Sequence, residues 1–222
     1  MASSASTDPT EVLRSLVGQP TRASRNRLLR LLTDREFAVR AVRYALRLPT
    51  PSRTEDRRVL EQVIFPYYVS RGDMRSVLFV GCDWYTRHYE KAFFRGRNYW
   101  TLEPLEGARK FGSKRRHIVA PLERLDEHFP EGYFDLIIAN GVYGFGLDGR
   151  EQCEAAFAHS HSRLRDGGHL IFGWNDVPQR RPVPLDEISS LKRFKPWTFP
   201  GFTSSRVLTD TPHRHVYEFY VK

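Results

Sequence analysis

Short apolar runs alternate with amphipathic stretches through most of the chain. The residues expected in strands are 77–81, 98–103, 117–120, 134–140 and 169–174, and those expected in helices are 87–94, 105–111, 122–128 and 151–164. This alternation predicts an α/β domain with a parallel, doubly wound sheet and right-handed crossovers. The run at 134–140 is largely apolar, which is expected where helices cover both faces of a sheet.

The last part of the chain has a different pattern. Residues 205–208 and 216–221 predict two strands, and Thr211, Pro212 and His213 between them predict a turn. The parallel sheet should therefore end in an antiparallel hairpin, which is more specific than a plain nucleotide-binding core.

The N-terminal part is expected to be helical. Residues 1–20 form a disordered N-terminus in this interpretation, residues 21–70 a helical cap, and residues 71–222 the α/β domain. Between residues 25 and 48, apolar residues recur at helical spacing with Arg between them, and Pro49 and Pro51 then end the helix.

Most of the positive charge lies near the N-terminus. Residues 1–75 hold 14 Arg, no Lys and 8 acidic residues, so they carry +6 of the net charge of +9. One interpretation is a face for nucleic acid or an anionic membrane. The other is a solvated amphipathic helix in an Arg-rich proteome. The sequence leaves both open.

Composition limits the class of protein. The chain has 222 residues, 40% hydrophobic content, and no apolar run near the roughly 20 residues that span a bilayer. Without an apolar N-terminal segment and with only Cys82 and Cys153, we expect a cytoplasmic protein without disulfides. The His and Cys residues lack metal-ligand spacing along the sequence, so no metal is predicted.

Two strand ends carry the candidate chemistry. Gly81 closes the run at 77–81, and Glu103 closes the next run about 20 residues later. This is the strand, turn, helix, strand, carboxylate order of a nucleotide-binding βαβ unit. Gly81 allows a tight turn close to a ligand, and Glu103 can accept hydrogen bonds from a ribose diol.

The order of motifs resembles the class I S-adenosylmethionine-dependent methyltransferases. The matching pieces are VLFVGC at 77–82, the strand ending in Glu103, FDLIIANGVYGFGL at 134–147 and LRDGGHLIFGWN at 164–175. The resemblance implies a mostly parallel seven-stranded sheet with a terminal antiparallel hairpin. It also implies S-adenosyl-L-methionine as cofactor, bound over the carboxyl ends of the strands, and methyl transfer to an O, N, S or C nucleophile.

The resemblance also implies a set of site residues. Those expected at the cofactor are Gly81, Cys82, Asp83, Glu103, Pro104, Leu122, Asn140 and Gly141, with Glu103 on the ribose and Pro104 and Leu122 beside the adenine. The aromatic content and the strand ends, rather than the resemblance, suggest the residues expected at the substrate, which are Tyr67, Tyr68, Tyr85, Trp174 and Asn175. His88 and Tyr143 are the catalytic candidates, and residues 178–202 lie where this family often inserts a substrate cover.

Departures from the family pattern keep other functions open. Phe79 replaces the usual acidic residue of the first motif, and Asp83 and Tyr85 stand where further glycines are common. A non-catalytic scaffold or regulator and an RNA-directed methyltransferase remain alternatives. A dinucleotide-dependent dehydrogenase would need a fuller G-x-G-x-x-G turn. The favoured hypothesis is a methyltransferase for a small-molecule acceptor, acting as a monomer or homodimer.

Overall fold

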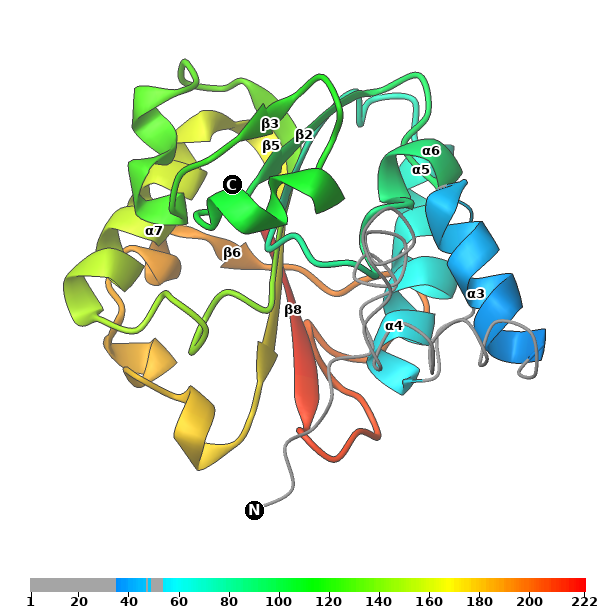
Figure 1. The fold of residues 1–222 in the computed structure, drawn as a ribbon. Helices are drawn as coiled ribbons and strands as arrows, with labels where there is room; N and C mark the ends of the chain where they lie inside the picture. The colour runs from blue at the N-terminus through cyan, green and yellow to red at the C-terminus, as the bar shows by residue number, and fades with distance from the viewer. Residues whose placement is uncertain (1–34, 47, 49–53) are drawn as a thin grey trace.

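A mixed sheet forms the centre of the molecule in the computed structural model, which describes residues 35–46, 48 and 54–222 (Figure 1). Its order is β3-β2-β1-β4-β5-β8-β6, with β7 also paired to β8. The strands are β1 Ser76–Val80, β2 Asn98–Leu102, β3 His117–Ile118, β4 Phe134–Asn140, β5 Leu164–Asn175, β6 Lys195–Pro196, β7 Arg206–Leu208 and β8 His215–Val221. The pairs among β1 to β5 are parallel, and β8 is antiparallel to its three partners.

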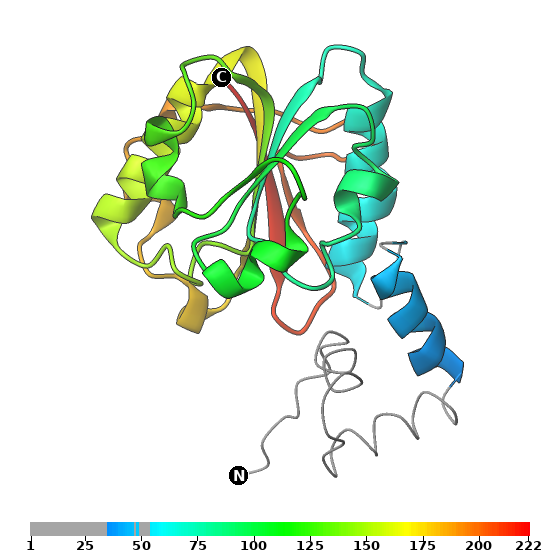
Figure 2. The ribbon, with the colours of Figure 1, turned by 45° about the horizontal axis from the view of Figure 1, so that its top comes forward.

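Helices lie on both sides of this sheet (Figures 1 and 2). They are α3 Arg35–Ala45, α4 Glu55–Val59, the π-helical segment η1 Leu60–Ile64, α5 Phe65–Ser70, α6 Tyr89–Ala92 and α7 Arg150–Arg163. Short 3₁₀ helices are η2 Glu106–Phe111, η3 Leu122–Glu127, η4 Pro178–Arg180, η5 Leu185–Glu187 and η6 Leu191–Arg193. The predicted doubly wound α/β architecture is confirmed.

Side chains of the central strands point alternately to the two faces of the sheet, and each face carries a hydrophobic core. In β4, Ile137 and Ala139 enter the core that contains α7, whereas Leu136 and Ile138 enter the core that contains η1, α5 and α6. Successive side chains of a strand point to opposite faces, so a strand covered on both faces is apolar at both sets of positions. This explains the apolar run that predicted β4.

One continuous helical stretch, α4–η1–α5, runs along the second core. The residues at its two junctions, Val59, Leu60, Ile64 and Phe65, have right-handed helical dihedrals. The start of the stretch lies at the carboxyl ends of the parallel strands, because Thr54, Asp56 and Glu61 line a cavity there. Its end lies at the opposite edge of the sheet, because the Tyr68 hydroxyl is 3.1 Å from Nδ1 of His169, which pairs with Leu136 near the start of β4.

Several details differ from the sequence predictions. The sheet has eight strands rather than seven, because the outer edge of β8 pairs with both β6 and β7. The helix expected at 87–94 is only Tyr89–Ala92. Within the described residues 35–46 and 48, the expected helix at 25–48 appears as α3. The rest of that helix and the disordered segment predicted for residues 1–20 lie outside the described residues.

The fifth strand begins earlier than predicted. Its pairing with β4 jumps from Leu164 opposite Phe134 to His169 opposite Leu136, so residues 165–168 bulge out of the ladder.

Across residues 35–46, 48 and 54–222, no helix is long and apolar enough to cross a membrane.

Candidate functional site

A cavity of about 960 Å³ lies where β1, β2, β4 and β5 end, with α4 on its other side. The carboxyl ends of neighbouring parallel strands meet at one edge of a sheet, which is the usual ligand site of open α/β folds. The lining residues are Thr54, Asp56, Arg57, Glu61, Gly81, Cys82, Asp83, Trp84, Tyr85, Glu103, Leu105, Gly107, Ala108, Phe111, Asn140, Gly141, Phe145, Asn175, His213 and His215.

The turn after β1 brings backbone close to the cavity. Gly81 has φ +89°, and its N–H donates to the Leu102 carbonyl at 3.1 Å. A Cβ at this position would lie 2.5 Å from the Asn140 carbonyl oxygen. Since a real Cβ does not approach an oxygen so closely, only glycine fits here without a shift of β4.

Glu103 is fixed at the end of β2 by two backbone donors. Its Oε2 accepts from the Cys82 N–H and its Oε1 from the Leu105 N–H, both at 3.1 Å. The side chain is buried, and this burial raises the pKa of the Glu103 carboxyl. Each carboxylate oxygen still has a second lone pair, so the group can accept two further hydrogen bonds from a ligand.

Acidic side chains outnumber basic ones in the cavity. Within the described lining, four carboxylates (Asp56, Glu61, Asp83 and Glu103) face one guanidinium, that of Arg57. Arg57 lies over the Tyr85 ring, 4.0 Å from its centroid, and donates to the Tyr89 hydroxyl at 3.2 Å. The cavity therefore has a surplus of negative charge that favours a cationic ligand.

A polar network forms the wall where β4, β5 and β8 meet. His215 Nε2 lies 3.0 Å from Asn140 Oδ1, and His215 Nδ1 lies 2.7 Å from Asn175 Oδ1. Burial lowers the pKa of His215 to about 4. A neutral imidazole has one N–H, so one of the two amides must present its NH₂ group to the other ring nitrogen.

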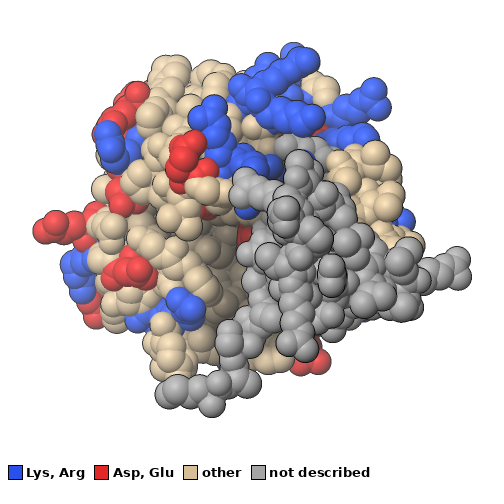
Figure 3. All heavy atoms as spheres, viewed as in Figure 1, with Lys and Arg blue, Asp and Glu red and all other residues tan. Residues whose placement is uncertain are grey.

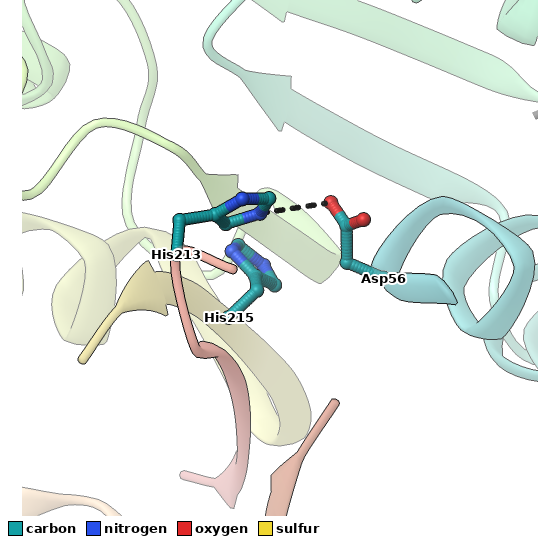
Figure 4. Close-up of side chains that lie close together, drawn as sticks. All are labelled: Asp56, His213 and His215. Carbon is teal, nitrogen blue, oxygen red and sulfur yellow. Dashed lines mark ion pairs between the residues drawn. The ribbon is translucent and has the colours of Figure 1, made fainter. Parts of the chain in front are cut away.

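Asp56 and His213 extend this polar wall toward α4. His213 Nε2 is 3.8 Å from Asp56 Oδ2, and His215 lies beside this pair (Figure 4). Asp56 is 6% exposed and His215 is 3% exposed. Two imidazoles and a carboxylate from opposite ends of the described chain thus meet in one corner of the cavity.

Aromatic rings supply much of the apolar lining. Trp84 and Tyr85 follow the β1 turn, Phe111 ends η2, and Phe145 lies in the loop after β4. Phe145 is held from outside by Arg180, whose guanidinium carbon is 3.7 Å from the ring centroid. Such faces suit a flat or cationic ligand.

The cavity brings together eight of the predicted site residues. Six were expected at the cofactor and two at the substrate: Gly81, Cys82, Asp83, Glu103, Asn140 and Gly141, and Tyr85 and Asn175. All eight lie at or just after the carboxyl end of a parallel strand. Their meeting follows from the parallel arrangement that the sequence predicted.

The two predicted catalytic residues lie elsewhere. His88 is buried against Tyr89, with ring centroids 4.9 Å apart, and burial lowers its pKa to about 4. Tyr143 is 1% exposed, packs edge-on against Phe172, and donates its hydroxyl to the Val183 carbonyl. Both rings fill hydrophobic core, so neither lines the cavity.

Tyr67 and Tyr68, predicted at the substrate, lie at the opposite end of the sheet. They lie in the last turns of α4–η1–α5. Only the first turns of this helical stretch line the cavity. Tyr67 packs on Phe199, and Tyr68 contacts His169, which pairs with Leu136 near the start of β4. Among the described residues of the cap predicted for 21–70, those that line the cavity lie between 54 and 61.

Three more predicted residues do not line the cavity. Leu122 is buried in the core beside α7, because it begins η3, which packs on that helix. Pro104 is exposed to solvent. Trp174 points away from Asn175, as alternate strand residues do, and donates from Nε1 to Glu218 Oε1 at 3.3 Å.

The segment predicted to cover the substrate packs elsewhere. Within residues 178–202, Val183, Ile188, Leu191 and Phe194 belong to the core beside α7. Phe199 belongs to the core on the other face. The segment thus covers both faces of the sheet, and none of its described residues lines the cavity.

Five of the lining residues that the sequence predictions missed carry ionisable side chains. They are Asp56, Arg57 and Glu61 from α4 and η1, and His213 and His215 from the terminal hairpin. His213 lies in the turn and His215 begins β8, and Arg214 between them has φ +49°, so the i, i+2 rule for extended strands does not account for their meeting. Nothing in the sequence near Asp56 indicates that it meets them.

Comparisons with known proteins find similarity in structure. No protein-family model and no curated protein matches the sequence. The N-methyltransferase NodS from Bradyrhizobium japonicum WM9, solved with S-adenosyl-L-homocysteine, has a TM-score of 0.54 at 16% identity, with 98% of this chain and 99% of NodS covered. A TehB-like SAM-dependent methyltransferase from Corynebacterium glutamicum has a TM-score of 0.51 at 16% identity, with coverages of 84% and 96%. The chain has the class I methyltransferase fold.

A third match supports the same fold. A SAM-dependent methyltransferase from Archaeoglobus fulgidus has a TM-score of 0.50 at 12% identity, with 74% of this chain and 94% of that chain covered. The class I methyltransferase fold expected from the motif order is thereby confirmed. At these identities the comparison concerns the path of the backbone, and the roles of individual side chains must be argued from the cavity itself.

Proposed function

We propose that the protein is an S-adenosylmethionine-dependent methyltransferase that acts on a small-molecule acceptor. The observation that carries the proposal is the Glu103 carboxylate, held at the cavity by the Cys82 and Leu105 N–H groups. A carboxylate fixed in this way matches a ribose diol, which offers two adjacent hydroxyl donors. The cofactor supplies an electrophilic methyl group when bound.

The rest of the cavity fits this cofactor. Gly81 and Gly141 have φ of +89° and +71°, so two strand ends present backbone without side chains to the cavity. The surplus of carboxylates suits the positive sulfonium. The rings of Tyr85 and Phe145 each carry a guanidinium on one face, which leaves the other face of each ring for a cation. We also propose that Asp83, which lines the cavity, binds the ammonium group of the cofactor's amino-acid end.

The cavity size supports a second, small ligand. Pockets of about 300–1,000 Å³ hold single drug-sized ligands. The volume of about 960 Å³ lies at the upper end of that range, so a cofactor that needs less than this volume would leave space for an acceptor. The side chains of the lining would hold the two molecules in line and exclude water, and such positioning supplies much of the rate of a displacement reaction.

Among the described residues, the placement of basic side chains favours a small acceptor over RNA, because Arg181, Arg206 and Arg214 near the cavity are paired with Asp176. On the face shown in Figure 3, Lys and Arg side chains gather toward the top. In the matching ribbon view this is the end where the parallel strands begin, whereas the cavity lies where they end (Figure 1). A nucleic-acid substrate would be expected to require a basic surface next to the cavity.

Calorimetry with S-adenosylmethionine and S-adenosylhomocysteine tests cofactor binding. The proposal predicts one site for each, and a lack of binding of both at millimolar concentration would refute it and favour the non-catalytic alternative. Acceptor size is tested by incubating the protein and S-adenosylmethionine with a cell extract separated by ultrafiltration. S-adenosylhomocysteine should form with the low-molecular-weight fraction; formation only with the macromolecular fraction would contradict the small-molecule assignment.

A further inference from the structure

We propose that Asp56, His213 and His215 bind a divalent transition-metal ion, with zinc as the reference ion. Asp56 lies in the first turn of α4, His213 in the turn before β8, and His215 at the start of β8 (Figure 4). Their potential ligand atoms all lie within 4.8 Å of one another. All three residues line the cavity at the carboxyl ends of the strands.

The spacing of these atoms is close to that of a metal centre. Bonds of about 2.0–2.1 Å in tetrahedral geometry place ligand atoms about 3.3 Å apart, so the three groups need to close by about 1.5 Å at most. The His213 side chain is 37% exposed and lies on a turn, so it has room to rotate. Asp56 and His215 are buried and would supply the fixed part of the site.

Asp56 carries an independent sign of a missing ligand. Its Oδ1 is buried and has no hydrogen-bond partner among the described residues, although the residue is only 6% exposed. A buried carboxylate oxygen without a partner is costly, and native proteins seldom leave one so. A cation held between Asp56 and the two imidazoles would satisfy it.

His215 is already oriented in the manner of a metal ligand. Ligating imidazoles commonly use one nitrogen for the metal and donate from the other to an oxygen, which fixes the ring. Its two nitrogens contact Asn175 Oδ1 and Asn140 Oδ1 at 2.7 and 3.0 Å. Release of one amide would free a nitrogen for the ion while the other amide still holds the ring.

The charges around the site favour a dication, although one positively charged side chain, that of Arg57, lies nearby. Arg57 Nε is 3.9 Å from Asp56 Oδ2 and opposes a cation there. Glu61, Asp83 and Glu103 in the same cavity offset that guanidinium. Two imidazoles and one carboxylate suit zinc and neighbouring transition metals, whereas magnesium and calcium prefer oxygen ligands alone.

The ligand set leaves a coordination position open toward the cavity. Catalytic zinc sites have three protein ligands and one exchangeable position, whereas structural sites have four protein ligands. The following consequence rests on the proposed function. The acceptor class would carry a hydroxyl or thiol group that binds the ion, loses its proton to solvent and thereby becomes the nucleophile.

Cobalt and zinc titrations of metal-free protein test the site without cofactor or acceptor. The parent should bind one Co²⁺ with the visible spectrum of four-coordinate cobalt, and one Zn²⁺ should displace it. Added 2-mercaptoethanol should produce a sulfur-to-cobalt charge-transfer band, because a position is open. If the charge-transfer band is absent, the claim of an open coordination position is wrong. If the protein does not bind one Co²⁺ or Zn²⁺ per chain, the proposed metal site is wrong.

Substitutions test whether Asp56 and His213 bind the ion. Loss of an outer partner of a metal site typically costs 10–100-fold in affinity, so Asp56→Asn and His213→Gln should each weaken Zn²⁺ binding by about 100-fold or more. His159→Gln is the matched control, since His159 lies 3.0 Å from Asp126 in a His–carboxylate pair outside the cavity. It should bind Zn²⁺ as the parent does.

Thermal melting separates misfolding from loss of the site. Zn²⁺ should raise the melting temperature of the parent and of the control but not of the two ligand variants, whose melting without metal shows that they fold. Unchanged Zn²⁺ affinity in both ligand variants would overturn the assignment. Cofactor calorimetry on the metal-free protein gives a separate answer for the proposed function.

Discussion

Replacement of Glu103 by Gln tests the ribose assignment with little change in shape. The parent carboxylate accepts from the Cys82 and Leu105 N–H groups through different oxygens. Gln has only one acceptor oxygen, so one of these N–H groups would face an NH₂ donor. The variant also loses the negative charge, and hydrogen bonds to charged groups are worth about 1.5–3 kcal/mol. We therefore expect S-adenosylhomocysteine to bind roughly 10- to 150-fold more weakly.

Calorimetry measures this affinity, and thermal melting must accompany it. An unsatisfied N–H costs about 1–3 kcal/mol of stability, although removal of a buried charge offsets part of the loss. Glu61→Gln is the matched control, because Glu61 is a second cavity carboxylate that accepts from the Tyr89 hydroxyl at 2.8 Å. It should change the affinity by less than about threefold. A folded Glu103→Gln variant with parental affinity would refute the assignment, and equal losses in both variants would indicate a general charge effect.

Three further predictions concern the turn after β1, the buried His169 and the catalytic candidate His88. Gly81→Ala should lower stability by about 1–3 kcal/mol and weaken S-adenosylhomocysteine binding, because its Cβ would meet the Asn140 carbonyl at 2.5 Å; denaturant unfolding with parental stability would contradict this. Burial and Arg71 lower the pKa of His169 to about 4, so its protonation favours the unfolded chain. Relative to His169→Gln, the free energy of unfolding of the parent should be constant above pH 6.5 and fall by up to about 3 kcal/mol between pH 6.5 and 4. Urea unfolding measures this difference. Parallel pH profiles of the two proteins would contradict the lowered pKa of His169. His88→Phe should retain the rate of methyl transfer within about twofold, because His88 is buried and its Nε2 has no hydrogen-bond partner in the described structure. A folded but inactive variant would support a catalytic role for His88.

The part of the site that the sequence predicted depends on local pattern. Val77 to Val80 and Leu136 to Ala139 are buried on both faces, so their strands could be found from apolar runs alone. Parallel order then requires Gly81, Glu103 and Asn140 to meet at one edge of the sheet. No packing detail is needed for that conclusion.

The part that the sequence did not predict depends on packing. Trp174 and Asn175 are neighbours in β5, yet only Asn175 lines the cavity, and the register of the strand decides which one does. Aromatic content suggested Tyr67 and Tyr68, but the direction of α4–η1–α5 carries them to the far end of the sheet. Asp56 reaches His213 through the packing of a helix on the sheet, which leaves no trace in local spacing.

The position of β8 has a consequence for how the protein is made. This strand follows all the others in the chain, yet it lies inside the sheet, between β5 on one side and β6 and β7 on the other. A nascent chain on the ribosome can pair β1 to β5 early, but the sheet stays open at β5 until β8 emerges and inserts. Such long-range pairing is intrinsically slow. Because His215 begins β8, the cavity wall with Asn140 and Asn175 closes only in this late step, so ligand binding reports that folding is complete.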